Sequence, residues 1–100
     1  MPFGVRIKAL REQKGLLQRQ LAASLEIDTP MFSKIERGER RAKRAQVVKL
    51  AELLEVDVDD LLTLWLADKV YEIIKDEDIA QEALKVAEST WKYSNSNKHV

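Results

Sequence analysis

The sequence predicts an all-α protein built from six helices. Of its 100 residues only three are Gly and two are Pro, which leaves little material for the many turns of a β-protein. Apolar residues recur at helical spacing through most of the chain, and no stretch alternates as a half-buried strand does. Apolar residues make up 45% of the chain and charged residues 34%, which favours a compact fold over a disordered chain.

A first helix is predicted over about residues 2–14. Phe3, Ile7 and Leu10 fall on one of its faces, at spacings of three and four residues. Gly15 follows at the position where a glycine commonly ends a helix, because glycine tolerates a left-handed backbone. The first helix should therefore pack one apolar stripe on the core.

Two short helices joined by a tight turn are predicted next, over about residues 18–25 and 28–38. Asp28 can cap the second of these helices, and Pro30 suits its first turn, where no N–H is needed. Gly38 ends that helix. The predicted inner faces of the pair consist of apolar residues: Leu21, Ala22, Leu25, Phe32 and Ile35.

A fourth helix is predicted over about residues 43–54, after a basic loop at 39–44. Asp57 is placed to cap a fifth helix, which is apolar around more than one face. A surface helix normally shows a single apolar stripe. We therefore expect one side of the fifth helix to contact its own core and the other side to contact another helix or subunit.

A sixth helix is predicted after the acidic run at residues 76–78, because acidic side chains favour a helix N-terminus. Its apolar stripe reaches Trp91 at helical spacing, and the residues that follow are polar and expected to fray. We thus expect three parts: a main domain at residues 1–68, a helical extension at 69–93 and a flexible tail at 94–100.

The charge is distributed unevenly although the formal net charge is zero. Residues 1–50 hold 12 Lys/Arg and 5 Asp/Glu, a net +7, whereas residues 51–100 hold 5 and 12, a net −7. This asymmetry predicts one surface for a polyanion and another that is kept away from it. The alternative is a chance pattern of charges on solvated helix faces.

The residues needed for most enzyme or metal chemistry are missing from the sequence. There is no Cys, the single His is His99 near the end of the chain, and no glycine-rich loop is present. The acids of residues 57–60 and 76–78 fit helix capping better than a cation site. We therefore predict no catalytic residue, metal or cofactor. No apolar run reaches the length of a membrane span and the first residues lack an apolar signal segment, so we expect a cytoplasmic protein.

The stretch from Gln18 to Gly38 reads QRQLAASLEIDTPMFSKIERG and carries the most specific pattern in the chain. Together with matching positions across residues 3–65, it resembles the helix-turn-helix of phage-repressor/Cro-type transcriptional regulators, the XRE family. The resemblance implies a five-helix repressor-like helix-turn-helix domain, to which this chain adds a C-terminal helix. Leu17 and Pro30 depart from the family pattern, which usually has polar residues at both positions.

The resemblance implies that the third helix reads DNA bases in the major groove with its N-terminal end. Thr29 offers a hydroxyl and a methyl group, Pro30 and Met31 offer apolar contact, and Lys34 can donate to guanine or to a phosphate. For Met31 the alternative is packing in the core. For Lys34 the alternative is a solvated surface position.

The resemblance also implies contacts with the DNA backbone, which should supply most of the affinity. Gln18 corresponds to a family glutamine that bonds a phosphate beside a helix N-terminus. Further phosphate contacts are expected from polar and basic side chains, each of which has ordinary surface charge or polarity as its alternative: Arg19, Ser33, Arg37, Arg40, Arg41, Lys43 and Arg44.

Arg11 and Glu36 match a pair that forms a salt bridge between the first and third helices in this family. Such a partly buried pair fixes orientation more than it adds net stability. We therefore expect the pair to be structural first, with Arg11 also able to face a phosphate.

The predicted function is a sequence-specific DNA-binding regulator that binds double-stranded DNA as a homodimer and acts as a repressor. The expected dimer contacts are Leu64, Trp65, Tyr71, Ile74, Leu84 and Trp91, unless the sixth helix only covers its own core. Two alternatives remain open: a controller of a restriction-modification operon, and an antitoxin-like regulator whose acidic half binds another protein.

Overall fold

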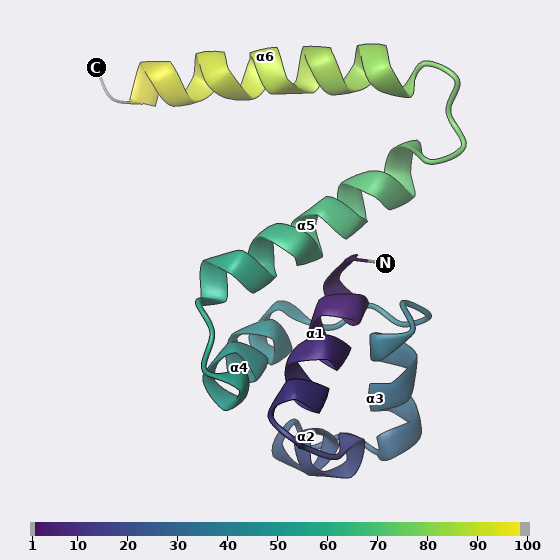
Figure 1. Cartoon of the computed structure of the whole chain (residues 1–100). Coiled ribbons are helices and arrows are strands. Elements are labelled where there is room, and N and C mark those ends of the chain that lie inside the picture. Colours follow the sequence, from purple (N-terminus) through teal and green to yellow (C-terminus); the bar gives the residue numbers. More distant parts are fainter. Residues whose placement is uncertain (1, 99–100) are drawn as a thin grey trace. The chain divides into compact units, whose positions relative to one another are not determined.

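The computed structural model describes residues 2–98, and these residues form six α-helices without a strand (Figure 1). The all-α prediction is therefore confirmed. The helices are α1 (Pro2–Gln13), α2 (Gln18–Ser24), α3 (Thr29–Glu36), α4 (Arg44–Leu54), α5 (Val58–Ile74) and α6 (Ala80–Lys98). The chain divides into two compact units, the first ending at residue 69 and the second starting at residue 70. Helix α5 crosses this boundary. The predicted roles of the main domain, the helical extension and the tail remain predictions.

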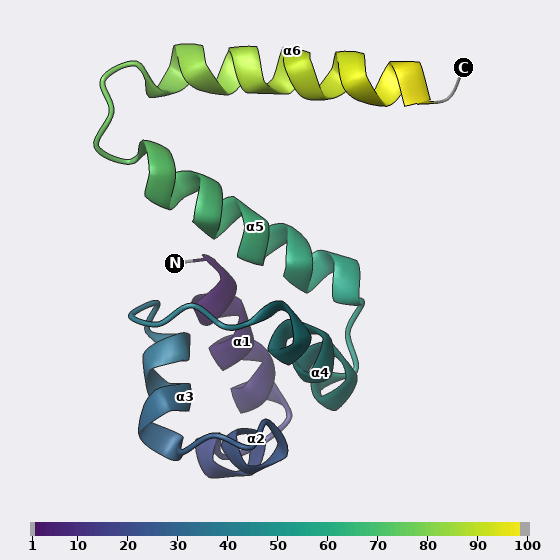
Figure 2. The same ribbon diagram turned by 180° about the vertical axis from the view of Figure 1, so that it is seen from behind.

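The first unit packs helices α1 to α4 and the start of α5 around one core. In both views α1 lies between α3 and α4, and α2 packs against α3 (Figures 1 and 2). The fully buried side chains come from all five helices: Ile7, Leu21, Phe32, Val47, Leu50, Leu54 and Leu61. These are residues at the predicted helical spacings, so one contiguous apolar core holds the unit together.

A glycine in a left-handed conformation lies just after each of α1 and α3. Gly15 has φ +67° and Gly38 has φ +76°, a left-handed conformation that costs glycine little because it has no Cβ. After α1, the N–H groups of Gly15 and Leu16 donate to the last carbonyl groups of the helix, at Glu12 and Arg11. The turn at Gly15 thus lets α2 follow α1 closely, and the turn at Gly38 ends the segment that holds α3.

The start of α1 is held by two contacts that the sequence did not predict. A Cβ at Gly4 would lie 2.3 Å from the carbonyl oxygen of Glu36, so glycine is what allows α1 to approach the end of α3. The N–H of Phe3 donates to Oδ2 of Asp68 over 3.2 Å, and Asp68 is only 7% exposed. Asp68 thereby ties α5 to the first turn of α1, where a carboxylate also suits the helix dipole.

Helix α5 buries one side and exposes the other. Leu61 and Asp68 are its buried residues, and neighbouring apolar side chains pack against the core. On its remaining surface Leu66, Tyr71 and Ile73 are exposed. The predicted contact with its own core is therefore present, while the predicted contact with another helix or subunit stays a prediction.

Helix α6 is longer than the sequence predicted. It continues beyond residue 93 to Lys98, whereas the pattern indicated a polar tail from residue 94. No Gly or Pro stops the helix there, and the side chain of Asn95 donates to the carbonyl oxygen of Trp91 over 2.8 Å. Ser and Asn are weak helix formers rather than helix breakers, so the helix continues. Residues 99 and 100, including His99, lie outside the described residues.

Candidate nucleic-acid interface

The first turn of α3 presents three of the four predicted base-reading residues, and Lys34 lies in the last turn of the same helix. Thr29, Pro30 and Lys34 are exposed, and Met31 is half-buried. Asp28 caps the helix, because its Oδ1 accepts a hydrogen bond from the N–H of Met31 over 2.8 Å. The missing N–H of Pro30 costs nothing in this first turn. This end of α3 is therefore both accessible and fixed in direction.

The turn before α3 allows the tight angle between α2 and α3. Glu26 has φ +59°, an uncommon left-handed conformation for a residue other than glycine. The N–H of Ile27 donates to the carbonyl oxygen of Ala22 over 3.0 Å, which satisfies the end of α2. Beneath the turn, Leu25 and Ile27 pack against the core. The two helices thus form a helix-turn-helix unit with a fixed turn.

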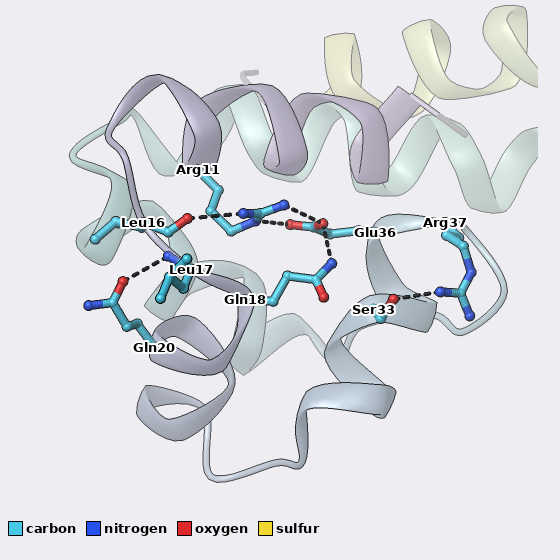
Figure 3. Close-up of polar contacts among 8 residues, drawn as sticks. All are labelled: Arg11, Leu16, Leu17, Gln18, Gln20, Ser33, Glu36 and Arg37. Atoms are coloured by element: carbon cyan, nitrogen blue, oxygen red, sulfur yellow. Dashed lines mark hydrogen bonds and ion pairs between the residues drawn. The ribbon is translucent and has the colours of Figure 1, made fainter.

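A buried carboxylate connects three elements behind this unit. Glu36 accepts hydrogen bonds from Arg11 at 2.7 Å and 3.1 Å and from Nε2 of Gln18 at 2.8 Å (Figure 3). The hydrogen bond with Glu36 raises the pKa of Arg11 above its ordinary value, against the lowering effect of burial. The ion pair implied by the family resemblance is thus present, and it also includes Gln18. It joins α1, the start of α2 and the end of α3.

The N-terminus of α2 is fixed although Leu17 has no side-chain group that can cap it. Oε1 of Gln20 accepts from the N–H of Leu17 over 2.7 Å, and Nη1 of Arg11 donates to the carbonyl oxygen of Leu16 over 3.0 Å (Figure 3). A glutamine at the third helical position reaches back in this way in a capping box. Gln20 therefore performs half of the usual capping arrangement, a role that sequence reasoning missed.

Ser33 and Arg37, both predicted to contact phosphate, contact each other on the outer side of α3. The guanidinium of Arg37 donates to Oγ of Ser33 (Figure 3). It also pairs with the carboxylate of Glu39. The side chains of Arg37 and Glu39 are each 55% exposed, so these contacts are in solvent and weak. Arg37 can exchange them for a phosphate at little cost.

An open cleft of about 750 Å³ lies between α1, α3 and the start of α2. Its lining combines apolar, acidic, basic and neutral polar side chains: Val5, Lys8, Ala9, Glu12, Gln18, Ser33, Glu36 and Arg37. Three of the residues predicted to contact DNA phosphates, Gln18, Ser33 and Arg37, meet here. Lys8 and Arg37 bring positive charge to the lining, and Glu12 and Glu36 bring two carboxylates to it.

The basic segment between α3 and α4, residues 39–44, is exposed except at one position. Arg40, Arg41, Lys43 and Arg44 are exposed, as is Arg19 on α2. In the middle of the segment, the side chain of Ala42 belongs to the core and is only 3% exposed. Sequence reasoning missed this anchor, because an alanine between basic residues gives no periodic signal.

The side chain of Trp65 lies against this basic segment. Its Nε1 donates to the carbonyl oxygen of Ala42 over 2.8 Å, and the guanidinium of Arg41 lies 4.0 Å from the ring centroid. Nη1 of Arg41 in turn donates to the carbonyl oxygen of Trp65 over 3.0 Å. Trp65 and Arg41, predicted as a dimer contact and a phosphate contact, are thus brought together in one chain.

The predicted dimer contacts fall into two groups. Leu64 and Trp65 pack against the core of the first unit. In the second unit Tyr71, Leu84 and Trp91 are 53%, 41% and 64% exposed, and Ile74 is half-buried. The first pair is largely committed to its own subunit, whereas the second group offers apolar surface.

Within residues 2–98 the structure shows no group of three or more His, Asp or Glu side chains placed to hold a metal ion. Among the helices of that same part of the chain, none is long and apolar enough to cross a membrane.

An exposed, capped helix end beside a basic segment, set at a fixed angle by a second short helix, defines a small helix-turn-helix DNA-binding domain. The chain belongs to this family: a family model described as a helix-turn-helix domain matches residues 2–64. The predicted family is therefore confirmed, and the protein is a DNA-binding transcriptional regulator.

Three relatives from Bacillus subtilis (strain 168) are similar to this chain. The uncharacterized HTH-type transcriptional regulator YazB is 36% identical over 59% of the chain and 86% of its own length. The HTH-type transcriptional repressor RghR is 38% identical over 60% of the chain and 45% of its own length. The uncharacterized HTH-type transcriptional regulator YqaE is 30% identical over 70% of the chain and 60% of its own length. No solved structure matches the chain.

Proposed function

We propose that this regulator is a repressor that binds a pseudo-palindromic operator as a homodimer, with α3 in the major groove. The observation that carries the proposal is the exposed N-terminal end of α3, with basic side chains on its borders. The major groove admits a helix and shows a different donor and acceptor pattern for each base pair. A helix-turn-helix reads that pattern with the first residues of its second helix.

The four proposed base-reading residues favour a mixture of apolar and polar contacts with the base edges. The methyl and hydroxyl groups of Thr29 suit either a thymine methyl or a polar base edge. Pro30 and Met31 offer only apolar surface, which also suits a thymine methyl group. Lys34 lies further along α3 and can donate to the N7 and O6 atoms of guanine. We infer a half-site in which A·T pairs face the start of α3 and a G·C pair lies beside Lys34.

The phosphate contacts surround this reading end. The amide of Gln18 has two N–H donors, and Glu36 takes one, so the second is available for a phosphate oxygen. Ser33 and Arg37 lie on the rim of the same cleft. Arg19 extends the positive border, as do Arg40, Lys43 and Arg44, and the charge of these side chains makes binding depend steeply on salt.

Dimerisation is proposed through the second unit. Tyr71, Ile74, Leu84 and Trp91 offer apolar surface there, on a part of the chain that is acidic and would be repelled by DNA. Pairing two copies would set two α3 helices about 34 Å apart, which is one turn of DNA. Each half-site contact is small, so two together give useful affinity. A different protein docked on this surface, as in an antitoxin-like regulator, is the second candidate.

Repression is proposed because RghR, a similar protein, carries the name of a repressor. A compact domain that occupies a promoter site can repress by excluding other proteins, without a further contact surface. If transcription rises when the protein binds its operator, the protein is an activator instead. We place this activity in the cytoplasm, where bacterial DNA is located.

A selection from a random DNA library with the intact chain tests this proposal. The expected product is two inverted half-sites with centres about 10 base pairs apart. A matched selection with the Lys34→Ala variant should lose the preference at one position of each half-site. Recovery of a single unrepeated site would remove the homodimer from the proposal, and recovery of no preferred sequence would remove sequence-specific binding.

A further inference from the structure

The basic segment 39–44 is attached to the rest of the first unit at several points. The N–H groups of Glu39 and Arg40 both donate to the carbonyl oxygen of Lys34 on α3, at 2.9 Å and 3.3 Å. At the other end, the N–H of Lys43 donates to Oε1 of Gln46 over 2.8 Å. The segment is therefore held at each end by the helix next to it.

Between these ends, Trp65 supplies the long-range attachment. Its indole N–H donates to the carbonyl oxygen of Ala42 over 2.8 Å, across 23 positions of sequence. The Ala42 side chain lies in the core, so this part of the segment is fixed on two sides. An indole has one donor and no acceptor, so this hydrogen bond uses the whole hydrogen-bonding capacity of the Trp65 side chain.

Arg41 contacts both the ring and the backbone of Trp65. Its guanidinium lies 4.0 Å from the ring centroid of Trp65, within the range of a cation–π contact. Its Nη1 donates to the backbone carbonyl oxygen of the same residue over 3.0 Å. The guanidinium of Arg44 is further away, 5.9 Å from the ring. Arg41 is thus held by the ring face and by the α5 backbone, whereas Arg40 and Lys43 remain exposed without such contacts to Trp65.

We propose that Trp65 is a positioning residue for DNA binding, and that Arg41 acts through Trp65 rather than through a phosphate. Together they hold segment 39–44 in the conformation in which Arg40, Lys43 and Arg44 meet the DNA backbone. The proposal rests on the phosphate role assigned to this segment. The physical gain is preorganisation, because a segment already ordered in the free protein loses less conformational entropy when it binds.

The test separates affinity from the salt dependence of affinity. Trp65→Phe keeps an aromatic ring and removes the indole donor, and Arg41→Gln removes the cation from the ring. We expect each variant to bind DNA about fivefold more weakly, the change that corresponds to one hydrogen bond or cation–π contact. Neither variant should change the slope of log K against log salt, because neither removes a phosphate contact.

Two matched variants calibrate this measurement. Arg40→Gln should reduce the slope by about 0.9 for each phosphate that the arginine neutralises in the wild type. Tyr93→Phe, a conservative change at an exposed aromatic residue of the second unit, should bind as the wild type does. The loss of affinity in the double variant of Trp65 and Arg41 should be smaller than the sum of the two single losses, because the two residues contact each other. The proposal would be overturned if Arg41→Gln reduced the slope of log K against log salt as much as Arg40→Gln does. It would also be overturned if Trp65→Phe bound DNA with the affinity of the wild type.

A second measurement keeps the test independent of DNA and of small stability losses. The indole N–H resonance that disappears in Trp65→Phe identifies the Trp65 signal in the NMR spectrum of the free wild-type chain. This proton should exchange slowly with solvent, and its signal should move in Arg41→Gln. Rapid exchange together with an unmoved signal would show that the attachment does not form. If the attachment is present but the wild type binds no DNA, the phosphate role of the segment fails instead.

Discussion

At the scale of single residues, Glu36 joins three helices of the DNA-binding unit. Its side chain is only 2% exposed and receives three hydrogen bonds, two from Arg11 and one from Gln18. The carboxylate therefore fixes α1 and the start of α2 against the end of α3. Because a buried charge without a partner is costly, the same residue makes the unit sensitive to removal of either partner.

Replacing Glu36 with Gln should lower the free energy of unfolding by about 3–5 kcal/mol, because it leaves the Arg11 guanidinium partly buried and unpaired. Urea unfolding followed by circular dichroism measures this difference. Glu52→Gln is the matched control, because Glu52 pairs with Lys49 in solvent and the pair should contribute less than about 1 kcal/mol. Equal losses in the two variants would show that the Arg11–Glu36 pair is not a buried one.

Gly4 provides a second test at this scale. Alanine is the better helix former by about 1 kcal/mol, so helix propensity alone predicts that Gly4→Ala is stabilising. The structure predicts the opposite, because the new Cβ would lie 2.3 Å from the carbonyl oxygen of Glu36, a backbone atom. We expect a net loss of about 1–3 kcal/mol in thermal or urea unfolding. Val5→Ala, at an exposed neighbour, should change stability by less than about 0.5 kcal/mol.

Three of the residues that sequence reasoning missed share one property. Gly4, Ala42 and Asp68 owe their roles to contacts with atoms 23 or more positions away in the chain. Periodicity reports which face of an element is buried, but it does not report which partner lies opposite. The partner of Arg11 was predicted only because a family resemblance supplied it.

At the scale of elements, the end of α1 and both ends of α3 were predictable because local groups determine them. Gly15 and Gly38 adopt the left-handed backbone expected after a helix, and Asp28 caps α3 with its side chain. The end of α6 was not predictable, because Ser and Asn neither favour nor prevent a helix strongly. The same reasoning explains why Leu17 looked like a weak start for α2, whereas Gln20 compensates for it.

The orientation of α3 yields a prediction about specificity. Thr29→Val and Lys34→Ala should each change the preference among bases at one position of the half-site, by about 1–3 kcal/mol for each base contact removed. Binding to operator variants with single base changes measures the effect. Arg40→Ala is the control, because removing a phosphate contact should weaken binding to all sequences about equally. A uniform decrease in Lys34→Ala would assign Lys34 to phosphate rather than to a base.

At the scale of the whole molecule, the two halves of the chain differ in charge and in the contacts that this charge allows. The first 50 residues carry a net +7 and hold the side chains proposed to face DNA, whereas the last 50 carry a net −7 and hold the exposed apolar residues of α6. We expect repulsion from DNA to leave the acidic half available for the proposed protein contact. The sequence predicted this division from charge alone, but it did not decide whether the proposed partner is a second copy of the chain or another protein.

The homodimer prediction belongs to this scale. Analytical ultracentrifugation at micromolar concentration should give twice the chain mass of 11.5 kDa. Leu84→Asp should return the mass to that of one chain and weaken operator binding, because it places a charge within apolar contact surface. Gln81→Asp, an exposed polar residue of the same helix, should leave the dimer intact. A monomeric wild type, or a stable complex only with another protein, would contradict the homodimer.

The central claim is that α3 reads DNA bases while the basic border holds the backbone. Fluorescence-anisotropy titration of the selected operator, and of a scrambled duplex, at several salt concentrations tests it most directly. We expect the affinity for both duplexes to fall steeply with salt. Each phosphate contact should contribute about −0.9 to the slope of log K against log salt concentration. We also expect operator binding that is at least about 10³-fold tighter than scrambled binding at physiological salt. Absence of binding at low salt, or equal affinity for both duplexes at every salt concentration, would contradict the claim.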